Sequence, residues 1–164
     1  MHYRLANEKD IEKIADMIKA AITEMENRGI YQWDDIYPSK EDFLLDIKNG
    51  QLFVGIAGDD ISVIFAVNEE YDEQYQNGAW KYPNCEYRII HRLCVNPKYQ
   101  NRGVARETLH HIETELRKAG IEAIRLDAYS GNPFALSLYH NNGYEKVGTA
   151  NWRKGTFFLM EKQL

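Results

Sequence analysis

The sequence contains few cysteines and no long apolar run, and both shortages exclude classes of protein. Its two cysteines, Cys85 and Cys94, form neither a disulfide framework nor a metal-ligand motif, which fits a reducing compartment. No apolar stretch approaches the roughly 18 residues of a membrane span, and the start Met1-His2-Tyr3-Arg4 lacks the apolar segment of a signal peptide. We therefore expect a cytoplasmic protein that binds no membrane and no metal.

Positive charge is also in short supply. Lys and Arg number 20 against 25 Asp and Glu, which gives a net charge of −5, and the basic residues form no stripe. A nucleic-acid partner is therefore disfavoured, whereas a cationic partner such as an amine suits the acidic surface. The length of 164 residues and the hydrophobic fraction of 44% predict one domain over residues 1–164. The sequence leaves open whether the chain forms a homodimer.

Hydrophobic periodicity and helix caps predict an α+β fold. Apolar residues spaced by three and four positions mark two early helices, with Asn7 and Ser39 as N-caps. No Gly-x-Gly-x-x-Gly follows the first strand, which disfavours a dinucleotide-binding fold. The expected strands cover residues 2–6, 51–57, 61–67, 86–95, 121–128, 144–149 and 155–161, and the expected helices begin at residues 8, 40, 103 and 133.

The most informative segment is Gln100-Asn101-Arg102-Gly103-Val104-Ala105, at the predicted junction of a strand and a helix. Asn96-Pro97 ends the strand, because proline cannot continue a β-ladder. A helix start exposes unpaired N–H groups and the positive end of the helix dipole, and Gly103 lets a ligand approach the backbone closely. With Arg102 and Arg106 adding positive charge, the pattern predicts an anion-binding turn.

A second segment, residues 132–144, is predicted to form a short helix with both ends marked. Asn132 is a good N-cap, Pro133 suits the first helical position, and Gly143 ends the helix. From the residues alone, Asn132 needs no ligand and Tyr139 packs the helix against the sheet.

Together the two segments resemble motifs of the GCN5-related N-acetyltransferase (GNAT) family. Residues 100–105 match its pyrophosphate-binding loop, Gln-x-x-Gly-x-Ala, at every fixed position. Residues 132–144 are similar to its later motif, Asn-x-x-Ala-x-x-Leu-Tyr-x-x-x-Gly-Phe, with Tyr144 in place of the phenylalanine. The resemblance implies a curved, mixed and mainly antiparallel sheet, with helices on both faces and two splayed central strands.

The resemblance also implies the chemistry, which is acetylation of a primary amine by acetyl-coenzyme A. The amine attacks directly in a ternary complex, so no serine or cysteine nucleophile is required. Main-chain groups of Leu93 and Val95 would bind the pantetheine arm, and the turn of residues 100–105 would bind the pyrophosphate. Asn132 occupies the position of a side chain that often binds the coenzyme, so it either caps the helix alone or also binds this ligand.

Two side chains are candidates for proton transfer. Tyr139 is at the family position whose tyrosine protonates the leaving thiolate, and a phenol with a pKa of about 10 is protonated at neutral pH. His91 is the candidate base, because a period of two places it on one strand face with Leu93. Arylalkylamine N-acetyltransferases, members of the same family, carry a histidine at what looks like the matching place. Alternatively, His91 is a hydrogen-bonded histidine packed in the sheet. Glu86 is then the candidate base, because other family members use a glutamate on this strand. Glu86 lies earlier in the strand than that glutamate, whose position is occupied here by Ile89.

The aromatic and acidic loop of residues 30–38 lies where the family places an acceptor-facing lid. Trp33, Asp34 and Tyr37 would contact the acceptor, because aromatic faces and carboxylates suit a cationic, partly apolar amine. The alternative is a loop that Trp33 anchors in the core. Two other functions stay open, an acyltransferase with a longer acyl donor and a coenzyme A-binding sensor or interaction module without catalysis.

Overall fold

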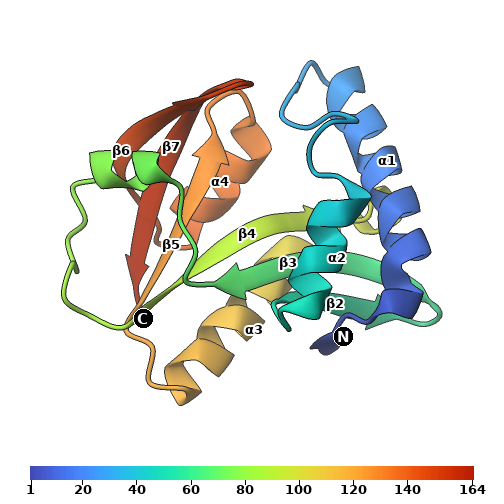
Figure 1. Cartoon of the computed structure of the whole chain (residues 1–164), viewed down its shortest axis with the longest axis horizontal. Helices are drawn as coiled ribbons and strands as arrows, with labels where there is room; N and C mark the ends of the chain where they lie inside the picture. Colours follow the sequence, from blue (N-terminus) through green and yellow to red (C-terminus); the bar gives the residue numbers. More distant parts are fainter. The chain divides into compact units, whose positions relative to one another are not determined.

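The computed structural model describes residues 1–164 and contains one mixed sheet and four α-helices (Figure 1). The strands are β1 (His2–Leu5), β2 (Leu52–Ala57), β3 (Asp60–Asn68), β4 (Tyr87–Val95), β5 (Ala123–Tyr129), β6 (Glu145–Trp152) and β7 (Gly155–Gln163). The helices are α1 (Ile11–Asn27), α2 (Lys40–Lys48), α3 (Val104–Lys118) and α4 (Pro133–Asn141). The strand order is β1-β2-β3-β4-β5-β7-β6; β4 and β5 are parallel, and β1–β2, β2–β3, β5–β7 and β6–β7 are antiparallel. The predicted fold class is confirmed.

The chain forms two compact units, each built from two separate chain segments. Unit 1 consists of residues 1–67 and 92–108, and unit 2 consists of residues 68–91 and 109–164. The boundaries fall inside β3, β4 and α3 rather than in linkers. That residues 1–164 act as one domain stays a prediction.

In unit 1, α1 and α2 cover one face of β2 and β3, and α2 crosses in front of these strands in Figure 1. Their shared core includes Ile14, Met17, Ile18, Phe43, Leu52, Val54 and Ile64. Both predicted caps are present, since Asn7 accepts a hydrogen bond from the Lys9 N–H and Ser39 accepts one from the Asp42 N–H. One 3₁₀ turn, Glu8–Asp10, precedes α1, so the α-helix begins later than expected.

In unit 2, the segment between β3 and β4 is more ordered than the sequence predicts. It contains a 3₁₀ helix, Glu73–Asn77, which places Tyr75 in an apolar cluster with Ile89, Ala150 and Leu159. The segment is polar apart from its aromatic residues, so its periodicity gave no sign of a helix. The aromatic rings therefore cover one face of the sheet in this unit.

The other contacts in unit 2 include a buried polar group between α3 and the segment after α4. The Tyr144 ring lies edge-on to the Tyr139 ring, with centroids 5.7 Å apart. The Tyr144 hydroxyl donates to the Glu113 carboxylate at 3.2 Å, and Lys162 Nζ donates to both oxygens of that carboxylate at 2.8 Å. The hydroxyl that distinguishes Tyr144 from the family's phenylalanine therefore has a hydrogen-bond partner.

The parallel pairing of the two central strands is short. It joins Tyr87–Ile89 with Ala123–Arg125, although both strands continue beyond these residues. The predicted separation of the central strands is therefore confirmed. Arg92 on β4 has a φ of +52°, in the left-handed region that non-glycine residues rarely adopt. Because this interrupts the side-chain alternation of β4, the period of two no longer supports placing His91 and Leu93 on one face.

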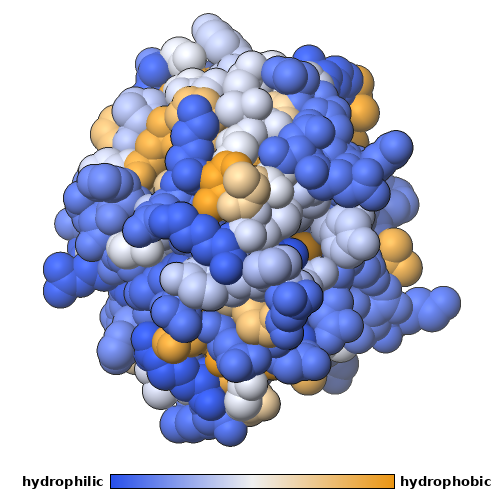
Figure 2. Space-filling view, turned by 90° about the vertical axis from the view of Figure 1, so that its left-hand side faces the viewer, coloured by the Kyte–Doolittle hydropathy of each residue, from blue (hydrophilic) through white to orange (hydrophobic).

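The surface is mainly hydrophilic on the face shown in Figure 2, where hydrophobic residues appear as small separate areas. The large apolar side chains that are exposed include Tyr31, Ile36 and Tyr37, all in the loop before α2. No helix is long and apolar enough to cross a membrane. The loop before α2 therefore presents aromatic and apolar groups to solvent.

Candidate functional site

Unit 1 contains the predicted anion-binding turn. Gln100 follows a short 3₁₀ helix, Pro97–Tyr99, and α3 begins at Val104. Between them, Asn101 and Gly103 have φ values of +61° and +78°. A β-carbon added at Gly103 would meet no atom within 4 Å, so the backbone here faces open space. A ligand can therefore approach the turn closely.

The turn combines unpaired donors with positive charge. The backbone N–H groups of Gly103, Val104 and Ala105 donate to no backbone carbonyl, as expected at the start of a helix. Arg102 lies over the Tyr99 ring, 5.7 Å from its centroid, and neither Arg102 nor Arg106 forms an ion pair. This arrangement suits a doubly charged ligand group such as a pyrophosphate.

Unit 2 positions the candidate acid on α4. Asn132 Oδ1 accepts a hydrogen bond from the Ala135 N–H at 3.1 Å, and Pro133 begins the helix, so the predicted cap is confirmed. Tyr139 is 8% exposed and packs edge-on against Tyr144. The coenzyme contact of Asn132 and the acid role of Tyr139 stay predictions.

The candidate base has a partner that the sequence did not indicate. His91 Nε2 lies 2.8 Å from Asn68 Oδ1, which also accepts a hydrogen bond from the Glu70 N–H at 2.9 Å. Because an amide oxygen only accepts, Nε2 carries a hydrogen and Nδ1 is the basic nitrogen of the neutral imidazole. Asn68 is distant in sequence and matches no motif, so only the fold brings it to His91.

The alternative bases are less well placed for proton transfer. The Glu86 side chain is 73% exposed, with its carboxylate 3.8 Å from the Arg88 guanidinium. This carboxylate is therefore open to solvent and lies beside a cation. Ile89 is fully buried in the cluster around Tyr75. The family's glutamate position, occupied here by Ile89, therefore offers no proton acceptor. His91 stays the leading candidate for the base.

The loop before α2 has contacts of its own that fix its shape. Trp33 is 8% exposed and belongs to the unit 1 core, so it anchors the loop. Asp34 Oδ1 accepts hydrogen bonds from the N–H groups of Ile36 and Tyr37 at 3.0 and 3.1 Å. The Tyr37 side chain is the more accessible of the three predicted acceptor contacts, with the residue 41% exposed. Acceptor binding by Trp33, Asp34 and Tyr37 stays a prediction.

A buried ion pair joins this loop to β4 and α2. Arg92 donates to Asp46 through Nε at 2.8 Å and Nη2 at 2.6 Å, and through Nη1 to the Tyr37 hydroxyl at 2.8 Å. Burial lowers the pKa of Arg92, but Tyr37 and Asp46 outweigh it and raise the pKa above its ordinary value. The guanidinium is therefore charged. Nothing in the sequence pairs an arginine in one strand with an aspartate in a distant helix.

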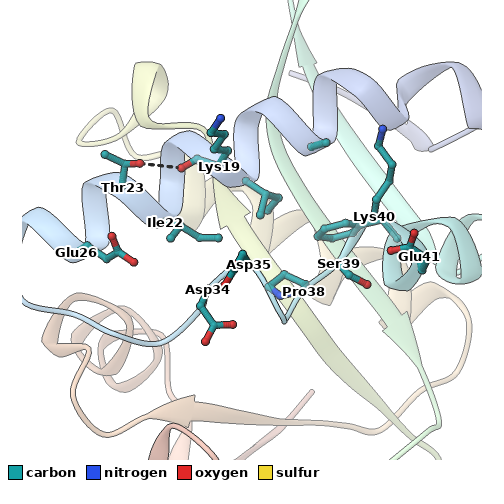
Figure 3. Close-up of a pocket in the computed structure, with 13 residues that line it drawn as sticks. Lys19, Ile22, Thr23, Glu26, Asp34, Asp35, Pro38, Ser39, Lys40 and Glu41 are labelled. Atoms are coloured by element: carbon teal, nitrogen blue, oxygen red, sulfur yellow. Dashed lines mark hydrogen bonds between the residues drawn. The ribbon is translucent and has the colours of Figure 1, made fainter.

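A groove of about 490 Å³ lies between α1 and the segment that leads into α2 (Figure 3). Its apolar lining includes Ile18, Ile22 and Phe43, and its charged lining residues are Lys19, Glu26, Asp34, Asp35, Lys40 and Glu41. In Figure 3, Ile22 points toward the loop, whereas Lys19 extends away from it. The sequence did not predict this groove, because it depends on how the loop folds back along α1.

The structure shows no cluster of potential metal ligands and no cysteine with a lowered pKa. No group of three or more His, Cys, Asp or Glu side chains is arranged to hold a metal ion. Both cysteines are free thiols; burial raises the pKa of Cys94 to about 12 and also raises the pKa of Cys85. Neither thiol is therefore activated as a nucleophile at neutral pH.

Comparison with known proteins shows the family. The model of the acetyltransferase (GNAT) family matches residues 14–144. The uncharacterized N-acetyltransferase YesJ of Bacillus subtilis is 23% identical over 95% of this chain and 86% of its own. A GNAT-family acetyltransferase structure from Streptococcus agalactiae has a TM-score of 0.87 at 26% identity, covering 99% of this chain and 95% of that one.

A second solved structure shows the same fold. The PaiA N-acetyltransferase of Thermoplasma acidophilum, crystallised with coenzyme A, has a TM-score of 0.72 at 19% identity, covering 99% of this chain and 98% of that one. The family match spans most of the sequence and includes both motifs, the turn of residues 100–105 and the segment of residues 132–144. The protein belongs to the acetyltransferase (GNAT) family.

Proposed function

We propose that this protein transfers an acetyl group from acetyl-coenzyme A to a primary amine of a small molecule or peptide. The observation that carries the proposal is the turn of residues 100–105, with its unpaired N–H groups and two unpaired arginines. GNAT enzymes use acetyl-coenzyme A, and the PaiA structure contains coenzyme A. The names of YesJ and PaiA as N-acetyltransferases support an amine acceptor.

In this proposal, donor binding relies mostly on backbone groups. The pyrophosphate binds the N–H groups of the 100–105 turn, and the pantetheine arm binds main-chain groups of Leu93 and Val95. Asn132 donates from its amide nitrogen, because its Oδ1 already caps α4. Arg102 supplies charge without a rigid partner of its own, which supports recognition of an anion.

The chemical step needs one base and one acid. A neutral amine attacks the thioester carbonyl, the new C–N bond forms, and the C–S bond breaks. His91 Nδ1 accepts the proton that the amine loses, and the Tyr139 hydroxyl protonates the departing thiolate. Trp33, Asp34 and Tyr37 contribute the acceptor-facing surface. We also infer that residues 1–164 act as one acetyltransferase domain in the cytoplasm, where Cys85 and Cys94 stay reduced.

The proposal is tested with a panel of primary amines and amino-terminal peptides, with acetyl-coenzyme A as donor. We expect release of free coenzyme A thiol, measured with a chromogenic disulfide, and an acetylated product detected by mass spectrometry. Parallel reactions with propionyl- and succinyl-coenzyme A test the longer-donor alternative. Tight binding of acetyl-coenzyme A without turnover of any amine would instead identify a coenzyme A sensor, and no binding would overturn the proposal altogether.

A further inference from the structure

Arg92 occupies a backbone conformation that its residue type disfavours. Arg92, with a φ of +52°, and Asn101 are the only non-glycine residues with a positive φ. Asparagine tolerates this left-handed region, whereas arginine rarely adopts it. The side chain of Arg92, unlike that of most residues in the sheet, makes three hydrogen bonds to other elements of unit 1.

Those contacts are charged, bidentate and buried. The guanidinium binds both oxygens of Asp46 in a forked arrangement, and the two side chains are 13% and 7% exposed. Water cannot replace either partner at such burial, so loss of one would leave an unpaired charge. Asp46 therefore fixes the direction of the guanidinium.

The third donor of Arg92 fixes the loop before α2. Nη1 donates to the hydroxyl of Tyr37, and Tyr37 is also the residue where the loop closes on itself. Its carbonyl accepts from the Asp34 N–H at 3.0 Å, and its own N–H donates to the Asp34 carboxylate. The loop's internal turn and its attachment to β4 thus meet at one residue. Asp34, Asp35 and Pro38 of this loop form one side of the groove in Figure 3.

We propose that Arg92 is a positioning residue that holds the acceptor-facing loop through the Tyr37 hydroxyl, with Asp46 orienting its guanidinium. The proposal rests on the proposed function, because it makes acceptor affinity depend on this contact. Neither Arg92 nor Asp46 needs to touch the acceptor. The donor-binding turn has no part in the network, so donor affinity should be independent of it.

The first test is steady-state kinetics of Tyr37→Phe, which removes one hydroxyl. We expect the KM for the amine to rise by about 10- to 150-fold, as for loss of a hydrogen bond to a charged group. Asp46→Asn, at a residue that does not contact the acceptor in this proposal, should raise the same KM, and the KM for acetyl-coenzyme A should be unchanged in both variants. Tyr31→Phe is the matched control, since Tyr31 lies in the same loop, is 57% exposed and has no hydrogen bond through its hydroxyl. An unchanged amine KM, or an equal rise in the control, overturns the proposal.

The second test is independent of turnover. Hydrogen–deuterium exchange of Tyr37→Phe and Asp46→Asn should show faster exchange at the amides of Ile36 and Tyr37. In Tyr37→Phe, exchange within α2 should be unchanged. If exchange in this loop is unchanged in both variants, Arg92 does not hold it, whatever the activity. If exchange is faster while the amine KM is unchanged, the role in acceptor binding is refuted. Failure of the proposed function would appear separately, as absence of turnover in the unaltered protein.

Discussion

At the scale of single residues, the two proton-transfer candidates have contrasting surroundings. Tyr139 is buried beside the ring of Tyr144. His91 is half-buried, and one ring nitrogen is already committed to Asn68. The two candidate roles can be tested separately, because one substitution changes each side chain.

Replacing Tyr139 by phenylalanine should slow turnover and spare donor binding. The variant keeps the buried ring and loses only the hydroxyl, so kcat should fall by about 10²–10⁴-fold, the range for a positioned acid or base. Single-turnover kinetics and calorimetry with acetyl-coenzyme A measure the two quantities. A variant that turns over at the full rate would make Tyr139 a packing residue.

His91 should set the acidic limb of the pH–rate profile. A neutral imidazole accepts the amine's proton and an imidazolium cannot, so activity should rise as pH passes the ordinary histidine pKa of about 6.5. His91→Ala should lose this limb and most activity at neutral pH, with partial recovery in alkaline buffer, where more of the amine is deprotonated. His140→Ala is the control, because His140 is exposed in the last turn of α4. A wild-type profile in His91→Ala would place the base elsewhere.

At the scale of elements, the strand-to-helix turn can be tested with an isosteric pair. Position 103 has a φ of +78°, which asparagine and aspartate tolerate better than other side chains, and space for a β-carbon. Gly103→Asn and Gly103→Asp therefore impose similar backbone strain and differ in charge. We expect the aspartate variant to bind acetyl-coenzyme A at least tenfold more weakly than the asparagine variant by calorimetry, since a carboxylate repels the pyrophosphate. Equal affinities would mean that the phosphate binds elsewhere.

Glu113 of α3 contacts Tyr144 and Lys162, and we expect loss of these two contacts to lower the free energy of unfolding by different amounts. Burial raises the pKa of Tyr144, so its hydroxyl stays protonated and donates to Glu113. Tyr144→Phe removes one hydrogen bond and should cost about 1 kcal/mol of unfolding free energy. Lys162→Met leaves the Glu113 charge, 5% exposed, without its nearest cation and should cost about 3 kcal/mol. Urea denaturation measures both, and equal losses would contradict the arrangement.

Elements were predictable where the signal is local. The caps Asn7, Ser39 and Asn132 each bond to a backbone N–H within three residues, so the sequence reveals them directly. Contacts between distant segments left no such signal. Tyr75 of the 3₁₀ helix Glu73–Asn77 packs against residues far along the chain, and Arg92 pairs with Asp46, 46 positions before it. The turn of residues 100–105 and the Asn132 cap were therefore predictable from the sequence, whereas the contacts that His91 makes with Asn68 and Tyr37 makes with Arg92 were not.

At the scale of the whole molecule, the donor should stabilise the fold. A ligand that binds only the native state raises the free energy of unfolding by about 2.7 kcal/mol at 100 times its Kd, which corresponds to a rise in Tm of about 5–10 °C at this size. Differential scanning fluorimetry should show this shift with acetyl-coenzyme A and a much smaller one with ATP or NADH at the same concentration. Equal shifts for the three would indicate general phosphate binding. The shift should shrink in Gly103→Asp.

The interleaving of the two units limits how this protein can recombine with its relatives. Each unit consists of two chain segments, and the chain passes from one unit to the other inside β3, β4 and α3. A single crossover between two parental genes therefore places residues from both parents in at least one unit, wherever the crossover falls. Only a chimaera with three breakpoints, near residues 67, 91 and 108, inherits each unit intact from one parent. Gene shuffling within this family should thus favour parents whose cores are already similar, because packed interiors tolerate mismatched volumes poorly.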